Sequence, residues 1–191
     1  MNTDRQVRSA TIADLPAIRE IYNHYVHNST CTFQLDLDTE DERLAWFRER
    51  TDRHPVVVIE ECGEVVAWGS LSPWKSRCAY SWSVEASVYV RHDRHRRGFG
   101  KAILRDLVDR ARQLGHHVVI GGACTEHPAS IALQKSVGFQ EVGTFRDVGY
   151  KFDRWLDVTY LQMTFPIHDE GQSCLAPANS PANDVCRAKE A

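Results

Sequence analysis

Hydrophobic residues recur along this chain with two different periods, and together these predict alternating strands and helices. In the segment 81–90, apolar and more polar side chains alternate, which is the period-two pattern of a strand with two different faces. Between residues 103 and 114 the apolar positions fall three or four apart, which indicates an amphipathic helix that Gly115 closes. A strand followed directly by a helix is therefore expected near the middle of the chain.

The same two periods extend to both ends of the chain. Strands are predicted at residues 7–10, 56–61, 64–72, 81–90, 117–123, 139–146 and 155–165, and helices starting near residues 11–14, 39, 98–101 and 128. Cys62 and Gly63 are expected to form the hairpin turn between the second and third strands. This order predicts a mixed α/β fold, with a central sheet flanked by about four helices and one strand–helix–strand unit in the middle.

The size and composition of the chain fit one globular domain. Of its 191 residues, 42% are hydrophobic and 26% are charged, which is enough to bury a core without disulfides or metal. Large aliphatic residues become rare after residue 167. We therefore expect a single domain at residues 1–167 and a disordered tail at residues 168–191.

Charge and hydropathy argue against several classes of protein. The net charge of -3 does not suit a general polyanion binder. No apolar run approaches the roughly 20 residues that a membrane-spanning helix requires. The N-terminal residues contain no apolar stretch that could act as a signal peptide, so a cytoplasmic protein is predicted.

Cysteine and histidine spacing predicts no metal site. The six cysteines include no pair separated by two residues, which is the spacing of structural zinc sites. His92 with His95, and Cys124 with His127, have the spacing of metal ligands, but no second pair completes either set. We expect these side chains to lie in the core or in solvent.

A glycine-containing loop joins the central strand to its helix. Gly98 and Gly100 lie where the helix is predicted to begin, within a basic segment. Unpaired N–H groups at a helix N-terminus, with glycines that allow close approach, suit a phosphate. The spacing matches neither the Walker loop nor the dinucleotide loop, whose third glycine position is Ile103 here. On this loop alone, a plain strand-to-helix turn is an equal alternative.

Several separated motifs resemble one enzyme family. The glycine loop, the Ser130–Leu133 segment and the Gly138-Phe139 pair follow one another as in the GNAT N-acetyltransferase superfamily. Segments 22–25, 29–33, 73–77, 79–82, 85–90 and 151–157 are similar to its phosphinothricin and methionine sulfoximine acetyltransferase group. The resemblance covers about residues 6–166. It implies the acyl-CoA N-acyltransferase fold, acetyl-CoA as co-substrate, a homodimer and a link to herbicide or antibiotic resistance.

The resemblance also implies how acetyl-CoA is held. The backbone of Val88, Tyr89 and Val90 would pair with the pantetheine arm. The amides that would hold the pyrophosphate belong to Arg96, Arg97, Gly98, Phe99, Gly100 and Lys101. Two positions depart from the family pattern, because His95 replaces the usual Gln or Arg and His127 replaces an Asn that commonly touches the cofactor arm. Either histidine could donate a hydrogen bond or lose the contact, and His127 is included among the predicted cofactor-binding residues.

Glu85 is the predicted catalytic base. Acetyl transfer requires an amine that has lost a proton, a donor for the thioester oxygen, and reactants held together. The group that the chain resembles has a Glu at this position and assigns it deprotonation of the amine. A surface glutamate on a strand is the alternative. Gln134 occupies the position of a thiolate-protonating Tyr in many related enzymes, so water or another residue must supply that proton.

An acceptor site is predicted around the loop that follows the hairpin. The predicted substrate-binding residues are Phe33, Trp74, Lys75 and Arg77. Arg77 has the forked cation that a carboxylate, phosphinate or sulfoximine group favours, whereas a solvated loop charge is its alternative. Lys151 and Trp155 are candidates to close the far side of the site, although Trp155 could equally belong to the core.

Three other functions stay open on the sequence. The basic segment 91–97 could bind nucleic acid, but it lacks interleaved aromatic residues for base stacking. The chain could bind acetyl-CoA without catalysis, although it retains Glu85 and Arg77. It could also acetylate protein N-termini or polyamines, whereas the aromatic residues favour a small enclosed pocket. The preferred prediction is direct transfer, without a covalent enzyme intermediate, to the amine of a small amino-acid-like acceptor.

Overall fold

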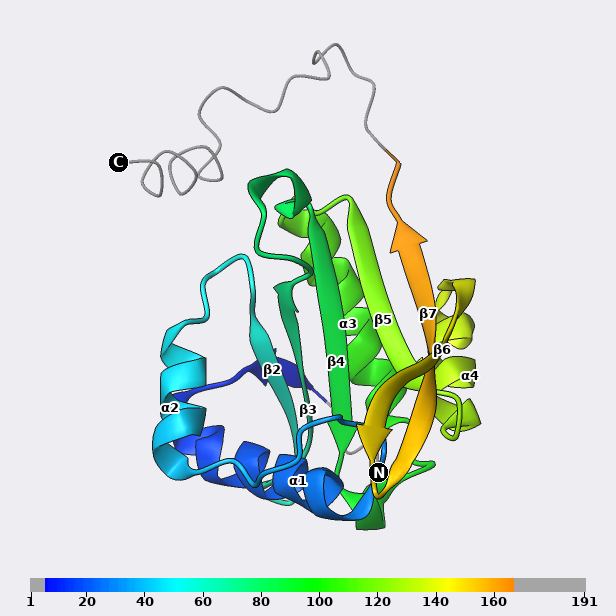
Figure 1. The fold of residues 1–191 in the computed structure, drawn as a ribbon. Coiled ribbons are helices and arrows are strands. Elements are labelled where there is room, and N and C mark those ends of the chain that lie inside the picture. The colour runs from blue at the N-terminus through cyan, green and yellow to red at the C-terminus, as the bar shows by residue number, and fades with distance from the viewer. Residues whose placement is uncertain (1–5, 167–191) are drawn as a thin grey trace, which may run out of the picture.

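The computed structural model of the chain describes residues 6–166, in which strands and helices follow the predicted order (Figure 1). The strands are β1 (Val7–Ser9), β2 (Val56–Glu61), β3 (Glu64–Pro73), β4 (Ser83–Val90), β5 (Val118–Cys124), β6 (Gln140–Lys151) and β7 (Arg154–Thr164). The α-helices are α1 (Leu15–Asn28), α2 (Glu40–Arg48), α3 (Phe99–Gln113) and α4 (Pro128–Val137), and the short 3₁₀ helices are η1 (Ile12–Asp14), η2 (Cys78–Tyr80) and η3 (His92–Arg94). The domain boundary at residue 167 and the tail at 168–191 lie outside the described residues.

One seven-stranded sheet forms the centre of the described residues. Its strand order is β1-β2-β3-β4-β5-β7-β6. Neighbouring strands run antiparallel except β4 and β5, which are parallel and are connected through α3. This is the predicted mixed sheet with one strand–helix–strand unit.

The ends of several elements lie where local signals place them. Thr39 and Glu42 form a reciprocal capping box at the start of α2. Gly138 ends α4 with a φ of 110°, and Gly63 turns the β2–β3 hairpin with a φ of 81°. The predicted helix start at residue 39 and the predicted hairpin turn at Cys62 and Gly63 are therefore confirmed.

Strand β6 is longer than predicted. It continues to Lys151 instead of ending near residue 146. Register shifts interrupt its pairing with β7 between Phe145 and Gly149, and Asp147 has a φ of 49°. Such a bulge bends a strand and breaks its period-two alternation, so the hydrophobic pattern could not follow the strand across it.

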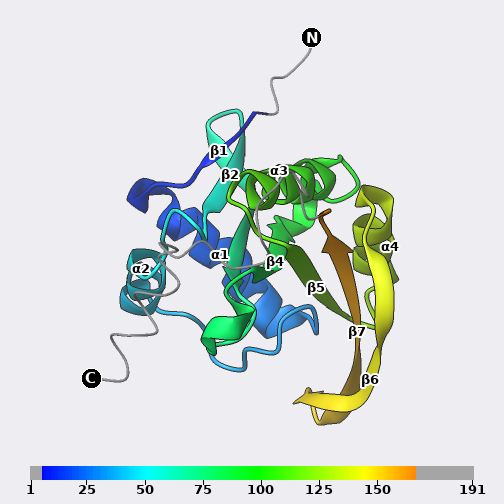
Figure 2. The same ribbon diagram turned by 90° about the horizontal axis from the view of Figure 1, so that it is seen from above.

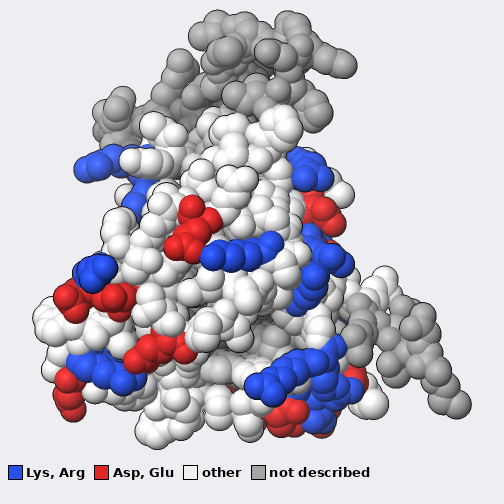
Figure 3. Space-filling view, turned by 90° about the vertical axis from the view of Figure 1, so that its right-hand side faces the viewer, with Lys and Arg blue, Asp and Glu red and all other residues white. Residues whose placement is uncertain are grey.

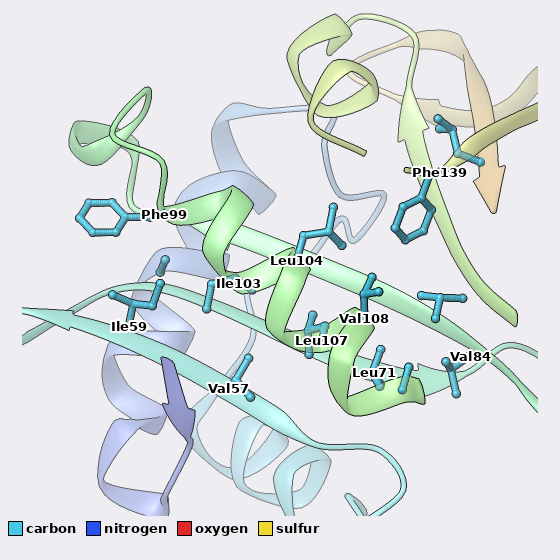
Figure 4. Packing of buried hydrophobic residues seen from close by; sticks show 14 of the residues in the cluster. Val57, Ile59, Leu71, Val84, Phe99, Ile103, Leu104, Leu107, Val108 and Phe139 are labelled. Atoms are coloured by element: carbon cyan, nitrogen blue, oxygen red, sulfur yellow. The ribbon is translucent and has the colours of Figure 1, made fainter. Parts of the chain in front are cut away.

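Helices cover both faces of the sheet. α3 packs on β2, β3 and β4 from one side, whereas α1 packs on β3 and β4 from the other side with α2 beside it (Figure 2). In the larger core, the apolar stripe of α3 meets side chains of β2, β3 and β4, among them Val57, Ile59, Leu71 and Val84 (Figure 4). Tyr89 faces the other way and packs with Trp68 beneath α1. The predicted two-faced strand is therefore confirmed, and Glu85 lies on the α1 face.

Candidate active site

The centre of the sheet opens where β4 and β5 separate. These parallel strands pair only over residues 83–85 and 118–120, and beyond these residues their ends diverge (Figure 1). The following segment of β4, Ala86–Val90, keeps its pairing with β3 but has no partner among the described strands on its other side. An unpaired strand edge can pair with the backbone-like amides of a ligand.

Two cavities meet in this opening. The smaller, of about 230 Å³, lies between the diverging strands, and Glu85 and Gly121 line it from opposite sides. The larger, of about 760 Å³, extends past Val90 to the glycine loop and Lys101. The residues that line both cavities are Cys31, Val88, Tyr89, His127, Ser130 and Leu133. The predicted base and the predicted cofactor-binding residues thus face one continuous opening.

The glycine loop has the geometry of an anion site at a helix N-terminus. Arg96 and Gly98 have φ values of 59° and 87°, and α3 begins directly after them. A Cβ atom on Gly100 would lie 3.2 Å from the side chain of Leu133, so a larger residue would crowd the approach to the helix. Backbone N–H groups that follow such turns point into one concave site, and the first N–H groups of α3 have no intrahelical partner.

Two side chains of the loop are already engaged within the protein. Arg97 forms an ion pair with Glu61 at 2.5 Å, and Phe99 is only 1% exposed in the larger core. Arg97 does not line the larger cavity, whereas Arg96, Phe99 and Lys101 do. Arg97 and Phe99 can therefore serve a ligand through their backbone groups, as the resemblance implies.

His95 is attached to the end of β4. Its Nε2 lies 2.5 Å from the Tyr25 hydroxyl and 3.2 Å from the carbonyl oxygen of Val90. The Tyr25 hydroxyl also donates to that carbonyl. Both side chains therefore converge on one carbonyl, and this nitrogen of His95 anchors the loop to β4 and α1.

His127 forms the N-cap of α4 and is oriented by a chain of hydrogen bonds. Its Nε2 lies 3.0 Å from Thr30 Oγ1, and that hydroxyl donates its single proton to the Glu126 carboxylate at 2.9 Å. Nε2 must then be the donor to Thr30. Burial lowers the pKa of His127, although the charge of Glu126 opposes this, so the ring is neutral and Nδ1 is an acceptor.

Glu85 lines the smaller cavity from the last paired residue of β4. It lies opposite Ile120 of β5, and the two strands separate directly beyond this pair. Burial raises the pKa of Glu85, whereas the positive charge of Lys75 acts in the opposite direction. A carboxylate with a raised pKa is a stronger base than a solvated one. The side chain therefore lies in a cavity with a raised pKa, unlike a solvated surface glutamate.

Tyr160 of β7 shares this cavity and was not predicted from the sequence. It pairs with Gly122 of β5, whose missing side chain leaves room for the phenol ring. Burial, and then the charge of Glu85, raise the pKa of Tyr160, so the hydroxyl stays protonated. Only the pairing of β5 with β7, which links distant segments, could have revealed this residue.

The structure places three predicted acceptor residues near the smaller cavity. Phe33 lines it and packs against Gly149 of β6. The ring of Trp74 meets Tyr160 edge to face, with 5.6 Å between the centroids. Lys75 Nζ lies 4.7 Å from the centroid of the Trp74 ring. These aromatic side chains form the apolar side of the site.

Other predicted acceptor residues lie elsewhere. Arg77 is exposed, precedes η2 and lines neither cavity, so it lies at most on the rim. Trp155 is 63% exposed and contacts Tyr150 on the β6–β7 hairpin, so the alternative that it belongs to the core is wrong. Lys151 is buried instead, at the end of β6. Side-chain direction on this hairpin depends on its bulge, which explains the errors.

Gln134 contributes an unpaired acceptor to the smaller cavity. Its carboxamide lies against Gly121, where any Cβ atom would clash with it. The side chain is 9% exposed, and its Oε1 has no hydrogen-bond partner among the described residues. A buried carbonyl oxygen of this kind suits a ligand that donates an N–H group.

Within residues 6–166, no three His, Cys, Asp or Glu side chains are grouped so that they could hold a metal ion. None of the helices in this part of the chain has the length and apolar character needed to cross a membrane.

Known proteins share this architecture. Residues 7–160 match the acetyltransferase (GNAT) domain family. The chain is 39% identical over 170 residues to the L-methionine sulfoximine/L-methionine sulfone acetyltransferase of Salmonella typhimurium. The matched region covers 88% of this chain and 99% of that protein. The solved ribosomal-protein-alanine N-acetyltransferase of Brucella melitensis is similar with a TM-score of 0.82 and 39% identity, covering 84% and 99% of the two chains. The phosphinothricin acetyltransferase of Sinorhizobium meliloti, solved with acetyl-CoA, gives a TM-score of 0.80 and 35% identity, covering 83% and 87%.

Proposed function

This chain belongs to the GNAT acetyltransferase family, and we propose that it transfers an acetyl group from acetyl-CoA to the α-amine of a small amino-acid-like acceptor. The acceptor would be of the phosphinothricin, methionine sulfoximine or methionine sulfone type, which are the substrates in the names of similar proteins. The observation that carries the proposal is the position of Glu85 where β4 and β5 separate. At this point a half-buried carboxylate, an open strand edge and a cavity come together.

The residues around the larger cavity fit acetyl-CoA. The free edge of Val88–Val90 offers N–H and C=O groups to a pantetheine arm, in the manner of an added strand. The N–H groups from Arg96 to Lys101 suit the pyrophosphate. In the adjoining smaller cavity, the unpaired Oε1 of Gln134 suits an amide N–H. When bound there, acetyl-CoA supplies the activated acetyl thioester.

The residues of the smaller cavity would carry the proton transfers. Glu85 takes a proton from the acceptor amine, directly or through one water, while the C–N bond forms and the C–S bond breaks. The acceptor amine itself attacks the thioester in this scheme, so both substrates are bound at once and no covalent intermediate forms on the protein. Gln134 has no acidic proton for the leaving sulfur, whereas the protonated Tyr160 hydroxyl can direct a hydrogen bond at the developing negative charge.

The size and lining of the smaller cavity support a small acceptor. Its volume of about 230 Å³ and the aromatic side chains of Phe33 and Tyr160 suit an amino acid in extended form. A protein N-terminus is the second candidate, because one similar structure is named as a ribosomal-protein-alanine N-acetyltransferase. Arg77 and Lys75 would then face a peptide instead of a free carboxylate.

A turnover screen tests the proposal. Release of free CoA thiol would be followed with phosphinothricin, methionine sulfoximine, methionine sulfone, ordinary amino acids, polyamines and N-terminal peptides as acceptors. We expect the highest kcat/KM with the first three compounds. Higher kcat/KM with peptides or polyamines would replace the proposed acceptor, and acetyl-CoA binding without any turnover would indicate a sensor.

We also propose that the protein is a homodimer, which the surface of the β6–β7 hairpin supports. Its exposed large apolar residues are Val142, Phe145, Val148, Tyr150, Phe152 and Trp155. Figure 3 faces the side of the molecule with α4 and β7, where much of the surface carries neither acidic nor basic side chains. Monomeric proteins rarely expose a large contiguous apolar patch.

Sedimentation velocity should give a dimer, and Phe145→Asp should shift it toward the monomer, whereas a monomeric parent protein would contradict the proposal.

A further inference from the structure

Lys151 is a charged residue in an unusually buried position. It is 3% exposed at the end of β6, and its Nζ donates to the carbonyl oxygens of Ser29 and Thr32, both at 2.8 Å. No carboxylate among the described residues forms an ion pair with it. Burial lowers its pKa, although the neighbouring Cys31 acts in the opposite direction. Burying an ammonium group without a carboxylate is costly, so its retention points to a role.

The ammonium group lies at the negative end of a helix. Ser29 is the C-cap of α1, where the last carbonyl groups have no intrahelical N–H partner. A cation at this end satisfies such carbonyls and interacts favourably with the helix dipole. The two carbonyls that Lys151 binds flank Cys31, so one side chain fixes the turn that follows α1.

This turn leads into one wall of the active site. The segment 31–33, here called the cavity wall, lines the smaller cavity that also contains Glu85. It is supported from β6 a second time, because Phe33 packs against Gly149. Lys151 itself lines neither cavity, so it does not contact a ligand there and can act only through the wall.

We propose that Lys151 is a positioning residue that sets the distance between the cavity wall and Glu85, and thereby orients the acceptor amine. This inference rests on the proposed acetyl transfer. Ser29 and Cys31 also line the larger cavity, but the backbone groups proposed to hold acetyl-CoA lie on β4 and at the start of α3, so we expect acetyl-CoA affinity to depend little on Lys151. A displacement of about 1 Å near reacting atoms can lower a rate by about two orders of magnitude.

Lys151→Met tests the role of the charge, because it keeps an apolar stem of similar length. With methionine sulfone as acceptor, we expect kcat/KM to fall about 10- to 100-fold, while calorimetry gives an acetyl-CoA Kd within about twofold of the parent value. Lys151→Arg, which keeps a cation, should recover part of the loss. Lys135→Met is the matched control, since that lysine is exposed and, among residues 6–166, forms an ion pair with Glu141 alone, and it should behave like the parent protein.

A second variant displaces the same wall without touching the charge. A Cβ atom at Gly149 would run into the ring of Phe33, so Gly149→Ala should produce the same acceptor-specific loss. If Lys151→Met does not fold, Lys151→Gln takes its place, since it removes the charge but keeps a hydrogen-bond donor, and Gly149→Ala tests only whether displacing the wall lowers acceptor turnover. An unchanged acceptor kcat/KM, or an equal loss of acetyl-CoA affinity, would overturn the role of Lys151. A parent protein that transfers acetyl to no amine would instead overturn the proposed function, and this inference with it.

Discussion

The two halves of the candidate site are built in different ways. The half that suits acetyl-CoA takes its backbone groups from one continuous stretch, residues 86–101, and residues of α1 and α4 also line its cavity. The half that suits the acceptor collects side chains from the turn after α1, from β4 and from β7. A backbone site tolerates changes of side chain, such as His95 and His127, whereas a site of converging side chains depends on each of them. Substitutions can therefore test acetyl-CoA binding and acceptor binding independently.

The largest effect is expected for Glu85→Gln in the acceptor half. The change keeps the size of the side chain but removes the basic oxygen, so kcat should fall by about 10²–10⁴ while acetyl-CoA affinity stays close to the parent value. The deficit should shrink as pH rises, because solution then supplies free amine. A variant with parental kcat at pH 7 would remove Glu85 as the base.

The parent pH profile gives the same test without a mutation. Glu85 must be ionised to act, so activity should fall as pH falls through its pKa. Because burial raises that pKa, the loss should begin at higher pH than for a solvated glutamate. Glu85→Gln should lack this acidic limb, and a limb that persists unchanged in the variant would belong to another group.

Gly98→Asp should give the next largest effect, in the cofactor half. Aspartate tolerates the left-handed conformation better than most residues, but its charge would face the pyrophosphate. Like charges in contact cost several kcal/mol, so acetyl-CoA Kd should rise about 100-fold. Gly63→Asp is the control, because that glycine also has a positive φ but has open space around it in a distant turn. Equal affinity in both variants, measured by calorimetry, would remove the loop from the cofactor site.

Arg77→Ala should have a smaller effect and only on the acceptor. Because the residue is exposed and lines neither cavity, its ion pair with a carboxylate should be screened by water. An exposed pair is worth up to about 1 kcal/mol, so the acceptor KM should rise by at most about fivefold. Steady-state kinetics with both substrates varied would detect this, and an equal rise in the KM of acetyl-CoA would contradict the assignment.

His127→Asn should have the smallest effect. It restores the residue that is usual in the family, at a position where backbone groups supply most of the cofactor contacts. One neutral hydrogen bond gained or lost should change acetyl-CoA Kd by about threefold or less. A change of 100-fold in calorimetry would show that the cofactor half depends on this side chain after all.

The sequence predicts the fold and the cofactor half more completely than the acceptor half. Thr39 and Gly138 mark helix ends through local geometry, and Gly98 and Gly100 stand next to the helix that they serve. Such features depend on neighbours within a few residues. They can therefore be recognised before any tertiary contact is known.

The acceptor half depends on contacts between distant segments. Tyr160 reaches the site only because β7 pairs with β5 beside Gly122. Lys151 binds carbonyls about 120 positions away, and the exposure of Trp155 follows from the path of the bulged hairpin. The periodicity of nearby residues carries no information on these long-range contacts. Residue type could therefore suggest which side chains are candidates to bind the acceptor, but not where in the structure they lie.

The divergence of β4 and β5 has a consequence for the empty enzyme. It creates a strand edge in the interior of the sheet, where Ala86–Val90 has no strand partner on this side and the carbonyl of Val90 is held instead by Tyr25. A ligand that pairs along this edge acts as a missing eighth strand and ties the two halves of the sheet together. Amide hydrogen exchange in this segment should then slow on ligand binding by more than at the continuous β2–β3 ladder, because occupancy removes local opening there. The proposed catalytic opening is thus also the place where ligand binding would add protection to the interior of the sheet.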